Sequence, residues 1–109
     1  MRLRRSLRPV SFVMMGSEQL ILHFFAPLAA GHPADLDTLT ELARKYGLYL
    51  VEDSSHAHGS EWRGHKIGAI GDVGTFSFQA SKLMTAGEGG MIVTNSPQIE
   101  RKLRSVHDC

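Results

Sequence analysis

A capped helical pattern followed at once by a short apolar run constrains the fold of this chain more than any other feature. Apolar residues recur at three- and four-residue spacing between Leu36 and Tyr46 and therefore share one helical face. Asp35 is a suitable N-cap and Gly47 stands where a left-handed C-cap is expected, so the pattern predicts a helix over this span. Leu48–Val51 is then continuously apolar, which is typical of a strand buried on both faces of a parallel sheet.

Further strands and a second helix are predicted on either side of this unit. The apolar run Leu20–Phe25 ends near a proline and predicts one strand, and residues 74–78 and 90–94 predict two more. Pro97 is favourable at the first position of a helix that follows the last of these strands. Elements in this order predict an α/β fold with a mixed, mostly parallel sheet flanked by helices.

Two carboxylates end the apolar run. Glu52 and Asp53 stand at the carboxyl end of the predicted strand, where open α/β sheets place their ligand crevice. Asp53 is thus a candidate site residue, whereas Glu52 suits a structural role as well as a catalytic one. Residues 54–71 contain four glycines and predict loops and turns, with Trp62 as a packing anchor.

Composition describes a soluble globular chain and excludes several classes of function. The 109 residues are 42% hydrophobic and 21% charged, with no apolar run near the roughly 18 residues that a membrane helix needs. Four of the 12 basic residues lie within the first ten, which leaves 8 basic against 11 acidic groups and no broad basic surface for nucleic acid. The single cysteine, Cys109, cannot form an internal disulfide, so a reducing, cytoplasmic location is expected.

The first thirty residues, basic and then apolar, form a segment apart from the rest. A signal peptide begins in this way, but residues 16–19 break the apolar stretch and include a charge. We therefore favour the interpretation of a strand at Leu20–Phe25 over that of a secretory signal.

The segment Ser77–Gly90 carries the residues best suited to chemistry. It places Lys82 among apolar neighbours, between a strand and a glycine-rich turn. A desolvated lysine amine is a nucleophile that can form a Schiff base with a carbonyl. Ser77 and Ser81 add hydroxyl donors of the kind that hold a phosphate. This segment therefore predicts a site built around Lys82.

Three segments together resemble the DegT/DnrJ/StrS family of pyridoxal-phosphate aminotransferases. They are V-E-D-S-S-H-A-H-G at residues 51–59, G-A-I-G-D-V-G at 68–74 and S-F-Q-A-S-K-L-M-T-A-G-E-G-G at 77–90. The resemblance covers residues 31–109 and implies part of the large domain of a fold-type I enzyme. Residues 1–30 do not match the family and form a separate segment.

The resemblance implies a role for each candidate residue. Lys82 holds pyridoxal 5′-phosphate as a Schiff base, Asp53 pairs with the pyridine nitrogen and Ser77 contacts the phosphate. His56 falls beside the cofactor ring. A carboxylate against the ring nitrogen keeps the ring cationic, so the cofactor acts as an electron sink. The freed lysine amine then moves a proton at the donor's α-carbon.

The resemblance also implies a reaction and its partners. An amino group passes from an amino acid such as glutamate or glutamine to a keto sugar or keto cyclitol, nucleotide-linked or free. Members of the family work as homodimers, so a homodimer is expected. No residue of this chain identifies the substrate.

Three alternatives stand beside this function. A catalytically inactive truncated paralogue or gene fragment would keep only the fold, since members of the family are several times longer. His56 and His58 suggest a metal site, although zinc needs three or four ligands and the other histidines show no ligand spacing. A dehydratase of the same fold would carry a histidine at the Schiff-base position, where this chain has Lys82.

Overall fold

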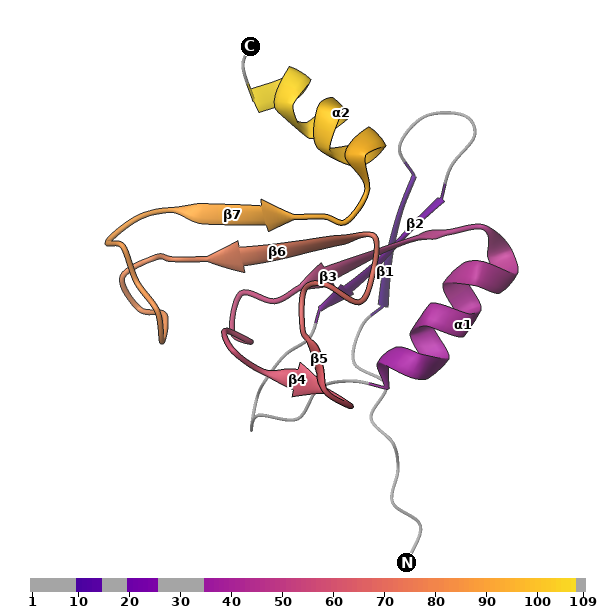
Figure 1. The fold of residues 1–109 in the computed structure, drawn as a ribbon, viewed down its shortest axis with the longest axis horizontal. Coiled ribbons are helices and arrows are strands. Elements are labelled where there is room, and N and C mark those ends of the chain that lie inside the picture. Colours follow the sequence, from indigo (N-terminus) through magenta and orange to yellow (C-terminus); the bar gives the residue numbers. More distant parts are fainter. Residues whose placement is uncertain (1–9, 15–19, 26–34, 108–109) are drawn as a thin grey trace, which may run out of the picture.

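Five strands form one mixed sheet in the computed structural model, which describes residues 10–14, 20–25 and 35–107 (Figure 1). Their order across the sheet is β1 (Val10–Met14), β2 (Leu20–Phe25), β3 (Tyr49–Asp53), β6 (Val73–Ser77) and β7 (Gly90–Val93). The two central pairings, β2 with β3 and β3 with β6, are parallel. The two outer pairings, β1 with β2 and β6 with β7, are antiparallel. The predicted α/β fold with a mixed sheet is confirmed, and its parallel part lies in the middle.

The helix α1 (Leu36–Tyr46) has the limits that its sequence predicts. The Asp35 side chain accepts hydrogen bonds from the Thr38 backbone N–H at 3.2 Å and the Thr38 hydroxyl at 2.8 Å. Gly47 ends the helix with a φ of 62°, a left-handed conformation that glycine adopts at little cost. Leu36 and Ala43 are buried and turn one face of the helix toward β3.

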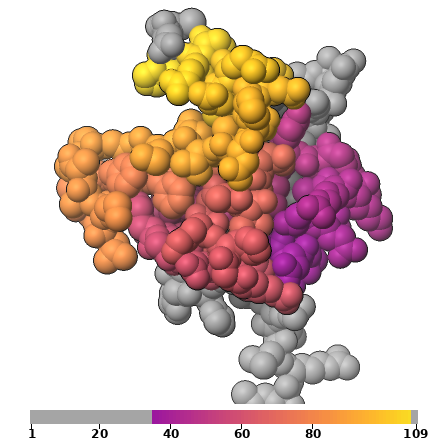
Figure 2. Space-filling view, viewed as in Figure 1, coloured from indigo at the N-terminus to yellow at the C-terminus, as the bar shows by residue number. Residues whose placement is uncertain are grey.

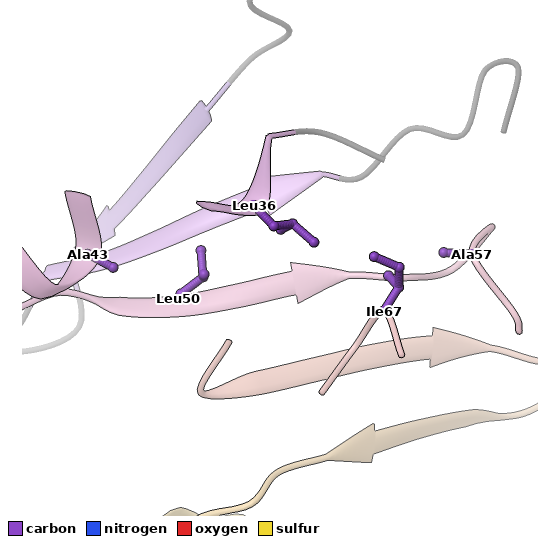
Figure 3. Close-up of a cluster of buried hydrophobic side chains, with 5 residues drawn as sticks. All are labelled: Leu36, Ala43, Leu50, Ala57 and Ile67. Carbon is purple, nitrogen blue, oxygen red and sulfur yellow. The ribbon is translucent and has the colours of Figure 1, made fainter. Parts of the chain in front are cut away.

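The buried core lies between α1, β3 and the loops that follow β3 (Figure 3). Its apolar members are Leu36, Ala43, Leu50, Ala57 and Ile67. Full burial of one leucine contributes about 2 kcal/mol. The core therefore fixes β3, and with it the residues at the carboxyl end of that strand.

The strand β3 differs from its prediction in extent and in burial. It includes Glu52 and Asp53, which pair with Gly74 and Thr75 of β6, rather than ending before them. Buried Leu50 and Glu52 alternate with partly exposed neighbours, so the strand is not buried on both faces as predicted. The apolar run does not predict a buried Glu52, because the backbone N–H groups that bond its carboxylate lie in the later 68–71 turn.

A small hairpin interrupts the segment predicted as loops and turns. It consists of β4 (Glu61–Trp62) and β5 (His65–Lys66), joined by Arg63 and Gly64, whose φ angles are 47° and 82°. Two consecutive positive φ angles are typical of the primed turns that close short hairpins. Trp62 packs against the core, which confirms its role as an anchor.

The remaining elements follow the predicted order. β2, β6 and β7 lie within one residue of their predicted limits, and the helix α2 (Pro97–His107) begins at its proline. β1 was not predicted, although the five residues between its apolar run and β2 include Gly16 and are compatible with a hairpin connection. Neither α1 nor α2, the helices in the described part of the chain, has the length and apolar character to cross a membrane.

Candidate functional site

Asp53, Thr75 and Ser77 share one face of the sheet. Asp53 is the last residue of β3 and pairs with Thr75, and Ser77 lies two residues further along β6. Paired residues of neighbouring strands, and residues two apart on one strand, point to the same face. The opposite face carries Leu50 and Glu52, which are buried. The carboxylate and the two hydroxyls therefore gather on the face opposite that core.

The Asp53 carboxylate is oriented by Ser55. Its Oδ1 accepts hydrogen bonds from the Ser55 backbone N–H at 3.1 Å and from the Ser55 hydroxyl at 2.5 Å. The Oδ2 oxygen has no hydrogen-bond partner among the described residues. Sequence reasoning missed Ser55, although a serine two residues after an aspartate is a familiar turn signal.

His56 and Lys82 meet, although 26 residues separate them in the sequence. The distance between Lys82 Nζ and His56 Nε2 is 2.9 Å, a hydrogen bond in which the tautomer of the imidazole decides which atom donates. His56 is exposed and Lys82 is partly buried. Two of the four predicted site residues are thus in direct contact, and the nearby Asp53 lies three residues before one of them.

The segment 77–90 projects from the end of the β6–β7 hairpin that lies away from α1 (Figure 1). In Figure 2 this orange segment forms the edge of the molecule opposite the magenta helix α1. Local bonds tie it back to β6: the Phe78 carbonyl accepts from the Ala86 N–H at 2.9 Å and from the Thr85 hydroxyl at 3.1 Å. The Lys82 N–H donates to the Gln79 carbonyl at 2.9 Å. These bonds set the position of the lysine backbone.

The apolar surroundings predicted for Lys82 form only in part. Lys82 is partly buried and Phe78 packs on the His58 ring, but Leu83 and Met84 are 89% and 58% exposed. These two side chains reach no core because the segment turns outward. The glycine-rich turn is real: Gly87 and Gly89 have φ angles of 85° and 150°.

Glu52 has a structural role, which resolves the choice that the sequence left open. Its carboxylate is fully buried and accepts from the backbone N–H groups of Gly68 at 2.7 Å, Ile70 at 2.8 Å and Gly71 at 2.6 Å. Hydrogen bonds to a charged acceptor are the strong ones. Glu52 therefore anchors the 68–71 turn to the strand that ends in Asp53.

The glycines at 68, 71 and 74 allow this close approach. A Cβ atom on Gly74 would lie 2.0 Å from the Gly68 carbonyl oxygen, and one on Gly71 would lie 2.7 Å from the Leu50 carbonyl oxygen. Neither distance leaves room for a side chain. The G-A-I-G-D-V-G segment is thus a packing motif that brings the turn against β3 and β6.

His58 lies apart from His56. Its ring centroid is 5.6 Å from that of Phe76 and 5.5 Å from that of Phe78. Both ring nitrogens are buried and have no hydrogen-bond partner among the described residues. His58 is thus packed between aromatic rings, and within residues 35–107 no group of three histidine, cysteine or acidic side chains could hold a metal.

The chemistry of these side chains fits pyridoxal phosphate. A carboxylate with one open oxygen suits a protonated ring nitrogen, a primary amine suits an aldehyde, and a hydroxyl suits a phosphate. Ser77 Oγ accepts one long hydrogen bond, 3.4 Å, from the Gln79 N–H, and no described residue takes its proton. Within the described residues the Ser77 side chain makes no hydrogen bond to the other three candidates.

Comparison with known proteins places this chain beside sugar and cyclitol aminotransferases. The model of the DegT/DnrJ/EryC1/StrS aminotransferase family matches residues 26–109. An L-glutamine:2-deoxy-scyllo-inosose aminotransferase of Streptoalloteichus tenebrarius is 46% identical, covering 77% of this chain and 19% of that protein. A dTDP-3-amino-3,4,6-trideoxy-alpha-D-glucose transaminase of Streptomyces venezuelae is 47% identical, covering 72% of this chain and 21% of that protein.

Solved structures with a similar fold are also aminotransferases. The solved structure of an aminotransferase from Psychrobacter cryohalolentis matches with a TM-score of 0.70 and 44% identity, covering 73% of this chain and 20% of that one. The chain therefore spans about a fifth of the length of the relatives that it matches.

Proposed function

This chain belongs to the DegT/DnrJ/EryC1/StrS aminotransferase family, and we propose that it forms the lysine-bearing part of a pyridoxal-phosphate aminotransferase site. The reaction passes an amino group from an amino acid such as glutamate or glutamine to a keto sugar or keto cyclitol. The observation that supports this best is the 2.9 Å contact between Lys82 Nζ and His56 Nε2, three residues after Asp53. Similarity to a glutamine-dependent inosose aminotransferase supports the donor and a cyclitol acceptor. Similarity to a dTDP-sugar transaminase supports a nucleotide-linked sugar equally well.

Four residues of this chain would hold the cofactor. Lys82 would bind its aldehyde carbon as a Schiff base, Asp53 its ring nitrogen and Ser77 its phosphate, with His56 beside the ring. Bound pyridoxal phosphate supplies an electron sink that stabilises the carbanion left when the donor's α-proton departs.

The side chains themselves carry the proton transfers. The Asp53 carboxylate holds a proton on the ring nitrogen by charge pairing. Lys82 Nζ takes the proton from the donor's α-carbon and later returns one, as general base and then general acid. His56 Nε2 lies within hydrogen-bond distance of that amine. It can therefore share the proton of Lys82 Nζ and orient the lone pair of the lysine nitrogen.

A second candidate is a catalytically inactive truncated paralogue or gene fragment that keeps the fold alone. One observation favours it: Leu83 and Met84, next to Lys82 in the sequence, are 89% and 58% exposed, so few apolar groups exclude water from the amine. Water near the amine weakens the electrostatic effects on which such a site depends. This candidate predicts a folded chain that forms no adduct with the cofactor.

The remaining expectations are part of the same proposal. We propose a cytoplasmic protein that acts as a homodimer, with residues 1–30 as a segment distinct from the cofactor-binding part at 31–109. Strands β1 and β2, from that first segment, nevertheless pair within the same sheet as β3.

The test is whether the 109-residue chain forms a borohydride-fixed adduct with pyridoxal phosphate. We expect a visible absorption band on mixing, and after reduction a mass increase located on Lys82. Lys82→Ala should abolish both, whereas Lys102→Ala, which changes an exposed lysine of α2, should leave both intact. A folded wild-type chain without an adduct would favour the inactive fragment, and an adduct that persists in Lys82→Ala would refute the role of Lys82.

A further inference from the structure

Ser55 makes two hydrogen bonds to a single oxygen of Asp53. Its hydroxyl donates to Oδ1 at 2.5 Å and its backbone N–H donates to the same atom at 3.1 Å. Asp53 and Ser55 are both partly buried. A free carboxylate turns readily about its terminal bond, because that torsion is broad. Two donors on one oxygen restrict this rotation.

The second oxygen, Oδ2, is bonded by no residue that the structure describes. The carboxylate is thus divided between an oxygen held by the protein and an oxygen open to a ligand. Charge-assisted hydrogen bonds depend on the direction of the acceptor lone pair as well as on distance. A ligand N–H that meets Oδ2 would find the acceptor already oriented and would lose less freedom on binding.

We propose that Ser55 is a positioning residue: its hydroxyl fixes the Asp53 carboxylate so that Oδ2 faces the protonated ring nitrogen of the cofactor. This inference rests on the proposed function, because the ring nitrogen belongs to pyridoxal phosphate. Ser55 itself touches neither cofactor nor substrate in this role. It acts through Asp53 and so controls how firmly the ring nitrogen keeps its proton.

The adjacent Ser54 provides a matched control. Ser54 is fully buried, whereas Ser55 is partly buried, and the Ser54 hydroxyl has no hydrogen-bond partner among the described residues. Its backbone N–H bonds the Thr75 carbonyl at 2.8 Å, which a change of side chain leaves in place. Ser54→Ala and Ser55→Ala therefore remove the same group from adjacent residues, but only the second removes a bond to Asp53.

The experiment follows the ring nitrogen directly. The chain and its Ser54→Ala, Ser55→Ala and Ser55→Thr variants are loaded with pyridoxal phosphate labelled with ¹⁵N in the ring, and the nitrogen chemical shift is recorded against pH. Borohydride fixation on Lys82 confirms loading, and far-ultraviolet circular dichroism confirms folding. In Ser55→Ala we expect the ring nitrogen to lose its proton at a pH about one unit lower, a tenfold weaker hold on the proton.

Each outcome decides the inference. Ser54→Ala should titrate as the wild type does, and Ser55→Thr, which keeps a hydroxyl, should restore the wild-type midpoint. A Ser55→Ala midpoint equal to that of the wild type, or an equal shift in Ser54→Ala, overturns the inference while the Lys82 adduct still supports the proposed function. Failure of the folded wild-type chain to form the adduct refutes the proposed function, and the role of Ser55 with it.

Discussion

The scaffold, residues 36–76, and the lysine loop, residues 77–90, are held in different ways. In the scaffold, buried or partly buried carboxylate oxygens bond backbone N–H groups far away in the sequence: Glu52 bonds the 68–71 turn, and Asp72 accepts from the Leu50 N–H at 2.8 Å. In the loop, by contrast, the bonds other than that of Lys82 to His56 join residues at most about one turn or one hairpin apart, as between Thr85 and Phe78. The loop contributes no side chain to the buried core.

This difference separates the two parts of the candidate site. Asp53 and His56 lie on the scaffold, where long-range contacts fix them, whereas Lys82 lies on the loop. The two parts meet within the site at Lys82 Nζ and His56 Nε2, and again beside it where the Phe78 ring packs on the His58 ring. Substitutions in the scaffold should therefore change global stability, and substitutions in the loop should change local order around the lysine.

The strongest test of the scaffold is Glu52→Gln. A glutamine side chain has one oxygen and one NH₂ group, so its NH₂ must face at least one of the three backbone N–H groups that now bond Glu52. That backbone N–H is then a buried donor without an acceptor. We expect a loss of about 3 kcal/mol in the free energy of unfolding, measured by urea denaturation. Glu61→Gln, on the exposed hairpin, should change it by less than about 0.5 kcal/mol. Equal effects of the two would show that Glu52 does not anchor the turn.

A pair of glycine substitutions compares the two regions directly. In Gly74→Ala the new Cβ would meet the Gly68 backbone at 2.0 Å, so β6 must shift, at a cost of about 2–3 kcal/mol. In Gly87→Ala no atom lies within 4 Å of the new Cβ, and the φ of 85° alone costs about 1 kcal/mol. Urea denaturation of both variants measures the difference, and a larger loss in Gly87→Ala would reverse the comparison.

The scaffold was largely predictable from sequence because its signals are local. The span of α1 follows from Asp35, Gly47 and the spacing of its apolar residues, all of which act within a turn or two. The extension of β3 through Glu52 was not predictable, since the three N–H groups that satisfy the carboxylate lie 16 to 19 residues later. A charged residue is predicted to be exposed unless the partners that could satisfy it in the interior are known.

The candidate site was predictable in its residues and not in its surroundings. Motif resemblance named Asp53, His56, Ser77 and Lys82, and the fold brings His56 to Lys82. The exposure of Leu83 and Met84 depends on which segments pack over the loop, and the apolar character of these residues carries no information about that. Ser55 was missed because its bond to Asp53 is a local turn contact that only coordinates assign to one oxygen.

Thr85→Val tests whether local bonds alone order the lysine loop. The Thr85 hydroxyl donates to the Phe78 carbonyl at 3.1 Å and accepts from the Gly87 N–H at 2.9 Å, and valine keeps the shape without either bond. We expect a local loss of about 1 kcal/mol, seen as about fivefold faster hydrogen exchange at the Gly87 amide. The urea midpoint of the scaffold should stay unchanged, and a fall like that of Gly74→Ala would show that the loop unfolds together with the scaffold.

The smallest effect is expected at the surface of the scaffold hairpin, where Lys66 Nζ and Glu61 Oε1 lie 2.6 Å apart. The hydrogen bond and charge of Lys66 hold the pKa of Glu61 below its ordinary value of 4.5. A lowered carboxyl pKa contributes stability that is fully present above 4.5 and is lost as the pH falls through the value in the folded protein. Because both side chains are about half exposed or more, solvent screens the pair and the contribution is slight. We expect Lys66→Met to have a slightly lower urea midpoint than the wild type at neutral pH and the same midpoint at a pH well below 4.5. A difference that persists in acid would assign the effect to packing of the Lys66 side chain rather than to its charge.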